Sequence, residues 1–62
     1  MTERQRLFAI GDLVTRTNRP DYGVGLITDY FSACDYMVLW SGTGMVIIQG
    51  ELFLNALKIP SQ

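Results

Sequence analysis

The chain has 62 residues and a mass of 7.0 kDa, 48% of its side chains are apolar, and its net charge is −1 at pH 7. These values exclude a disordered or collagen-like chain and a two-domain enzyme, and no apolar run is long enough to span a membrane. Domains below roughly 70–80 residues often add disulfides, metals or oligomerisation to their stability. Cys34 has no second cysteine to pair with, which indicates a reduced, cytoplasmic protein, and the absence of histidine and of a metal-ligand cluster leaves oligomerisation.

The first predicted strand follows a polar tail and a turn. Residues 1–7 form the expected tail, and Gly11-Asp12 predicts a turn that leads into a strand around Val14. Residues 18–21 then combine Pro with Asn and Asp, which is a composition typical of loops.

Two glycines precede the second predicted strand. Gly23 and Gly25 lead into residues 26–31, and glycine at the start of a strand indicates a bulge or a close approach of two backbones. A short connection at 32–35 joins this strand to a third strand at 36–40.

The clearest hairpin lies in the second half of the chain. A tight turn at 41–44 joins the third strand to a fourth strand at 45–49. A helical turn at 50–54 precedes a short last strand at 55–59, which Pro60 ends.

Five short strands at about ten-residue spacing predict a small all-β fold, and a helical turn before the last strand is typical of a five-stranded SH3-like barrel. The expected boundaries are 1–7 for the N-terminal tail, 8–59 for the barrel and 60–62 for the C-terminal tail. The motifs that carry this assignment are Gly11-Asp12-x-Val14, Tyr22-Gly23-x-Gly25-x-Ile27, Val38-x-Trp40-x-Gly42 and Leu54 before the last strand. They resemble small SH3-like barrel proteins, which are often encoded by tailed bacteriophages, and they predict a fold better than a function.

A more distant resemblance is to the plasmid-borne type II dihydrofolate reductases. It rests on Phe8-x-x-Gly11-Asp12-x-Val14 in the first strand and on the Gly25-Leu26-Ile27 step. In that family, SH3-like protomers form a tetramer with one central pore that binds folate and NADPH. The resemblance places the interface tryptophan near Tyr22, and it places the pore residues at Arg16, Val46, Ile47, Ile48 and Gln49.

Three of these pore positions differ from the family. Ile47 stands where the family has glutamine, Gln49 stands where it has tyrosine, and Arg16 stands where it has a lysine, which is also cationic but has a different shape. An apolar side chain cannot make the amide hydrogen bonds that orient the two rings for hydride transfer. We therefore expect no reductase activity and no bound cofactor, and the reductase-like pore remains the alternative interpretation.

Other binding and catalytic functions have weaker signals. Tyr22 and Tyr36 are the candidate exposed members of an aromatic groove for a Pro-rich peptide or a methylated lysine. The chain has no histidine to act as a base, and the carboxylates lie on separate segments, so the sequence shows neither a catalytic base nor an oriented nucleophile.

An accessory nucleic-acid-binding barrel is a further alternative. The first 19 residues carry a local charge of +2 because they contain four arginines, namely Arg4, Arg6, Arg16 and Arg19. Phosphate binding usually needs more basic charge and a higher pI than 4.9, so we expect weak or absent DNA binding at physiological salt.

The alternation of apolar residues predicts both a core and an interface. The central core is expected at Val14, Ile27, Val38, Trp40 and Leu54. If Val46 and Ile48 also point inward, the outward side chains of the hairpin form one uncharged patch of Met37, Leu39, Met45 and Ile47. If the register is reversed, the outward residues are Val38, Val46 and Ile48, and the patch is still apolar.

An exposed apolar patch usually marks an interface. The sequence therefore predicts a non-enzymatic module that self-associates, as a two-fold dimer or a dimer of dimers, and that binds a protein partner.

Overall fold

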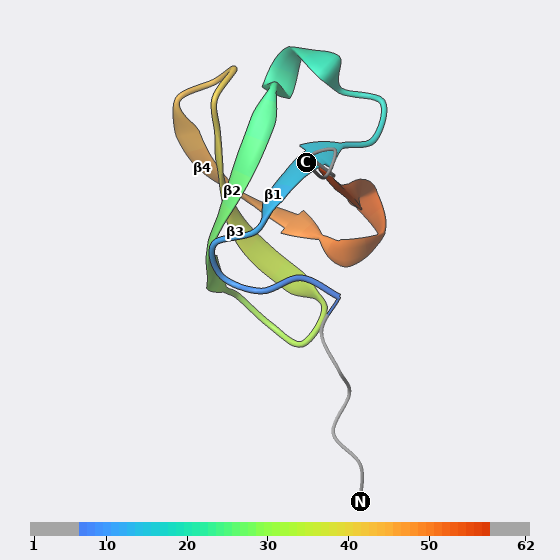
Figure 1. The fold of residues 1–62 in the computed structure, drawn as a ribbon. Coiled ribbons are helices and arrows are strands. Elements are labelled where there is room, and N and C mark those ends of the chain that lie inside the picture. Colours follow the sequence, from blue (N-terminus) through green and yellow to red (C-terminus); the bar gives the residue numbers. More distant parts are fainter. Residues whose placement is uncertain (1–6, 58–62) are drawn as a thin grey trace, which may run out of the picture.

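The computed structural model describes residues 7–57, which form one antiparallel sheet of five strands (Figure 1). The elements are β1 (Leu13–Arg16), η1 (Pro20–Tyr22), β2 (Val24–Tyr30), β3 (Asp35–Trp40), β4 (Met45–Gly50), η2 (Glu51–Phe53) and β5 (Leu54–Ala56), where η denotes a 3-10 turn. The all-β class and the helical turn before the last strand are confirmed.

The last strand covers Leu54–Ala56, so it begins one residue before the expected range of 55–59, and Leu57 follows it. Residues 58–59 of the predicted strand and most of the predicted tails lie outside the described residues. No helix within residues 7–57 is long and apolar enough to cross a membrane.

The strand order in the sheet is β4-β3-β2-β1-β5. The seven-residue strand β2 pairs with both β1 and β3, so it links the two halves of the sheet. Figure 1 shows the 41–44 turn and the η1 connection at the same end of the molecule, and Gly42 donates its N–H to the Tyr22 carbonyl there at 2.8 Å. Because β4 and β5 stand at the two ends of the strand order, they are the edge strands of the sheet.

The five predicted core residues are all buried, with exposed fractions between 0 and 6%: Val14, Ile27, Val38, Trp40 and Leu54. Phe8 and Tyr36 complete this cluster. The core follows the two-residue period of the strands, because successive side chains point to opposite faces of the sheet. The core prediction is confirmed.

Gly25 leaves room for two side chains of the core. A Cβ at this position would lie 2.5 Å from Val38 Cγ1 and 2.7 Å from Trp40 Cζ3, closer than real Cβ atoms come. Gly25 is therefore needed for the packing of these side chains and not for a close approach of two backbones. The bulge of β2 lies elsewhere, between Ile27 and Asp29.

The register of β4 differs from the one expected first. Trp40 pairs with Met45 across the four-residue turn, so Val38 pairs with Ile47. Residues directly opposite one another share a face, so Ile47 points inward and the assignment of Val46 and Ile48 to the interior is wrong. The latter two are 48% and 46% exposed. The physical reason is the length of the turn. Because the first four residues of β4 are all apolar, their pattern does not select a face, and the turn length decides which β4 residue pairs with which β3 residue.

Candidate functional site

The outer face of the sheet carries a group of neighbouring apolar side chains. Leu26 on β2 lies opposite Leu39 on β3, which lies opposite Val46 on β4. In the same way Met37 lies opposite Ile48. We call these five residues the outer patch. Its members other than half-buried Met37 are 38–48% exposed.

The same row continues across the rest of the sheet. Leu13 on β1 lies opposite Leu26, and Leu57, which follows β5, donates its N–H to the Leu13 carbonyl at 3.0 Å. Both side chains are 37% exposed. One row of apolar side chains therefore crosses β1 to β4 on the solvent side and ends at Leu57, just after β5.

Two acidic residues lie beside the outer patch, and none of its five members is charged. Asp29 is opposite Met37 across the bulge of β2, and Asp35 begins β3 at the same end, where its carboxylate accepts a hydrogen bond from the Ser32 hydroxyl at 2.8 Å. The patch is therefore uncharged with an acidic end. Burying it against another surface needs no desolvation of an ion, which is the main cost of burying charged residues.

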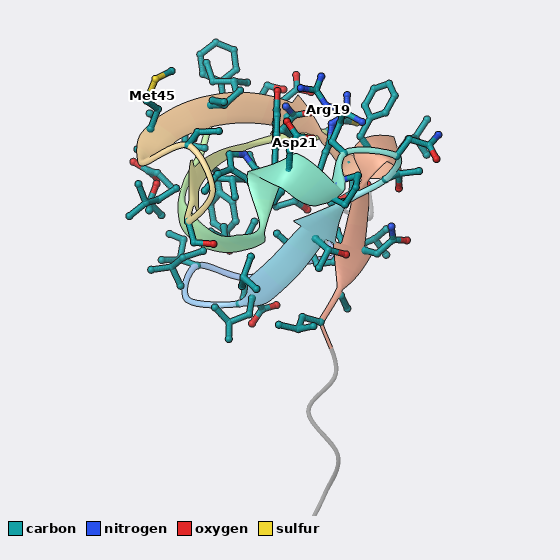
Figure 2. All side chains as sticks on the ribbon, turned by 90° about the horizontal axis from the view of Figure 1, so that it is seen from above. Arg19, Asp21 and Met45 are labelled. Atoms are coloured by element: carbon teal, nitrogen blue, oxygen red, sulfur yellow. The ribbon has the colours of Figure 1, made fainter. Side chains whose placement is uncertain are left out.

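The four predicted interface residues are divided between the two faces. Met37 and Leu39 belong to the outer patch. Ile47 packs against the core, and Met45 is 58% exposed but lies opposite Trp40 at the end of the hairpin, where Figure 2 shows it projecting from β4. Of the other patch members, Leu26 was missed, and Val46 and Ile48 were expected on the outer face only for the reversed register. The signal that distinguishes the two registers of β4 is the four-residue turn.

The predicted pore residues are also divided. Arg16 Nε donates to Gln49 Oε1 at 2.9 Å, and the Arg16 guanidinium lies 4.6 Å from the centroid of the Phe53 ring. Arg16 and Gln49 thus lie on the inner side of the sheet, where Ile47 packs against the core. Val46 and Ile48 lie on the opposite face, so within one protomer the five positions do not line a common surface.

A second arginine lies on the η1 connection and is paired. Arg19 forms a 3.0 Å salt bridge with Asp21, and its guanidinium lies 4.6 Å from the centroid of the Tyr22 ring. Figure 2 shows Arg19 and Asp21 side by side, well away from Met45. The hydrogen bond from Arg19 lowers the pKa of the Asp21 carboxyl, and the same bond raises the pKa of Arg19. Arg4 and Arg6 lie outside the described residues.

The two candidate groove tyrosines are not exposed together. Tyr36 is fully buried, because it shares the inward face of β3 with Val38 and Trp40, and its hydroxyl donates to Glu51 Oε2 at 2.5 Å. The prediction that Tyr36 lines an exposed groove is therefore wrong. Tyr22 is half-buried and packs edge-on against Trp40, with ring centroids 5.3 Å apart.

Comparisons of the chain with protein families, curated proteins and solved structures found no match. The geometry of residues 7–57 is therefore the basis for a functional proposal. The residues of the outer patch lie together on one exposed face, whereas the predicted pore and groove residues do not. Its chemistry is apolar contact.

Proposed function

We propose that this chain is a non-enzymatic assembly module that binds a second copy of itself through the outer patch. The observation that carries the proposal is the outer face of β2, β3 and β4, where leucine, valine and isoleucine stand at positions that are 38–48% exposed. Antiparallel sheets with one solvated face normally place polar residues there. A contiguous exposed apolar surface marks an interaction site.

A second copy is the occupant that the surface fits best. A two-fold axis places the same patch against itself, so apolar side chains meet apolar side chains and the patch contributes no charge to the interface. The acidic residues Asp29 and Asp35 stay at the end of the patch, where water can still solvate them. The self-contact is therefore favourable without any complementary charge.

An interface of ordinary size would cover a modest share of the surface of this chain. A protein–protein interface of ordinary size buries about 800 Å² on each partner. That is less than a fifth of the 4500 Å² accessible surface of this chain. Burial of apolar surface contributes about 25 cal/mol per Å², and a domain this small gains stability from any additional burial.

The solution mass of the wild type and of two leucine variants tests the proposal. We expect a wild-type mass above 7.0 kDa at micromolar concentrations by light scattering. Leu39→Glu places a carboxylate within the outer patch and should shift the mass toward 7.0 kDa, because the interface would bury an unpaired charge. Leu52→Glu is the matched control: Leu52 is 92% exposed on η2, outside the patch, and its variant should keep the wild-type mass.

Two results would contradict the proposal. A wild-type mass of 7.0 kDa up to high micromolar concentrations would exclude self-association and leave a different protein partner as the occupant of the patch. Equal masses for Leu39→Glu and the wild type, with both proteins folded and associated, would place the interface elsewhere on the surface.

A further inference from the structure

The edge strand β4 lacks the features that normally protect a sheet edge. It is six residues long, contains no charged residue and no proline, and pairs with β3 without a bulge. Natural proteins shield such edges with lysine, proline, bulges or very short strands. The opposite edge, β5, has only three residues, so the contrast within one sheet is direct.

The hydrogen-bond alternation shows which β4 groups face the free edge. Glu51 donates its N–H to the Cys34 carbonyl at 2.8 Å, which continues the register of β3 with β4. In an antiparallel ladder every second residue bonds to a given neighbour. Therefore Met45, Ile47 and Gln49 bond to β3. The N–H and carbonyl groups that point away from β3 belong to Val46, Ile48 and Gly50.

These outward main-chain groups have no hydrogen-bond partner elsewhere in residues 7–57. Within residues 7–57, no turn, loop or side-chain hydrogen bond reaches the main chain of Val46, Ile48 or Gly50. The side chains of Val46 and Ile48 lie on the outer face, so the edge is continuous with the outer patch. Main-chain donors and acceptors at a sheet edge are a template for the addition of another strand.

We propose that β4 pairs antiparallel with β4 of a second copy across a two-fold axis at Ile48. This inference rests on the proposed self-association and adds a second interface to it. With Ile48 opposite Ile48 of the second copy, Val46 lies opposite Gly50, and every main-chain group on the free edge gains a partner. The outer faces stay in register, since facing residues share a face.

The acidic ends are kept apart in this arrangement. Asp35 pairs with Gly50 at one end of β4, and the antiparallel orientation brings the hairpin end of the second copy beside it. Edge pairing uses main-chain groups and the outer patch uses side chains, so both contacts can form together. Their combination is a closed assembly of four copies with a mass of about 28 kDa, from 7.0 kDa per chain.

Gly50 offers a matched pair of variants. Its φ of −71° is already suited to proline, and an added Cβ would make ordinary contacts at 3.4 Å from Asp35 Oδ1 and 3.5 Å from Phe53 Cδ2. Gly50→Pro removes one edge N–H and places its ring at the edge. Gly50→Ala adds a Cβ but keeps the N–H, and neither variant changes an apolar side chain of the outer patch.

The test combines solution mass with amide hydrogen exchange measured by NMR. In the associated wild type and in Gly50→Ala, the Val46 and Ile48 amides should exchange at least about ten-fold more slowly than in dilute monomer, because they become hydrogen-bonded. The Ile47 amide, which bonds to β3 in every state, is the internal reference. Gly50→Pro should lose the added protection and have a lower mass than Gly50→Ala.

The two proposals fail in different ways. If the wild type associates but the Val46 and Ile48 amides gain no protection, edge pairing is wrong and association through the outer patch stands. A mass of 7.0 kDa under all conditions would overturn both proposals. If Gly50→Pro does not fold, the exchange rates of the wild type and Gly50→Ala decide the question.

Discussion

The inner and outer faces of the sheet both carry large apolar side chains but differ in burial. On β2 and β3 the inward residues Ile27 and Val38 are at most 1% exposed, whereas the outward residues Leu26 and Leu39 are 38% and 39% exposed. These positions alternate along the same two strands. Apolar composition alone therefore does not identify the core of this chain; the strand register does.

The difference between the faces also separates folding from function. The inner face is filled to the point that Gly25 has no room for a Cβ. The outer face has no packing partner within residues 7–57, and yet its side chains are those of a core. We interpret the inner face as the source of the fold and the outer face as the surface for assembly.

The largest expected effect comes from truncating neighbouring residues on opposite faces. Ile27→Ala should lower the free energy of unfolding by about 2–5 kcal/mol, because it leaves a cavity in a closely packed interior. Leu26→Ala should cost less than about 1.5 kcal/mol in dilute monomer, since its side chain is already partly in water. Urea melts measure both values.

Equal destabilisation by these two variants would remove the distinction between the faces. It would also place Ile27 outside the core, in contradiction to its 1% exposure.

A methyl group added to the inner face should also destabilise the chain. Gly25→Ala forces Val38 and Trp40 to move and should cost about 1–3 kcal/mol, which is typical of overpacking. Gly50→Ala, whose Cβ has ordinary contacts, is the control and should cost less. Thermal melts that coincide for Gly25→Ala and the wild type would show that the side chains of Val38 and Trp40 do not pack so closely against residue 25.

The buried hydroxyl of Tyr36 should contribute less to the free energy of unfolding than the side chain of Ile27 does. Tyr36→Phe removes a donor to Glu51 Oε2 and the acceptor of the Phe8 N–H, so it should cost about 1–3 kcal/mol. Tyr22→Phe is the control, because the structure shows no hydrogen bond of its hydroxyl within the described residues. A Tyr36→Phe variant as stable as Tyr22→Phe would show that the buried hydrogen bonds are replaced by water.

The smallest effect is expected from the exposed ion pair of the η1 connection. Arg19 lowers the pKa of Asp21 in the folded state, so the pair stabilises the fold above the unfolded pKa and this contribution is lost as the pH falls through the folded pKa. Asp21→Asn should therefore lower the melting temperature slightly at neutral pH and should leave it unchanged in strong acid. Because both partners are solvated, high salt should also remove the difference. A large difference that persists in strong acid would contradict this account.

Much of the fold could be predicted because several signals coincide. Glycines and turn residues separate the strands, and Val38 and Trp40 alternate with the period of a strand. The register of β4 could not be read from its own residues, since Met45-Val46-Ile47-Ile48 is apolar at every position. Only the turn length distinguishes its two faces.

The errors in the candidate site have the same origin. Tyr36 follows the alternation of β3 and is buried, although its hydroxyl suggested an exposed groove residue. The hydrogen bond between Arg16 and Gln49 joins positions far apart in the sequence, and the resemblance to the pore enzymes named both residues without indicating their contact. Side-chain contacts between distant strands depend on packing, which residue patterns do not specify.

The most direct test of the central claim is an isotope-filtered NMR experiment on a mixture of labelled and unlabelled chains. Contacts between copies should involve the methyl groups of the outer patch, first those of Leu39 and Val46, and should disappear in Leu39→Glu. The core methyl groups of Ile27 and Val38 serve as the negative control, because they are buried within one chain. Intermolecular contacts confined to other exposed residues, such as Leu52, or no intermolecular contact at high micromolar concentration, would contradict the assignment of the outer face as the assembly surface.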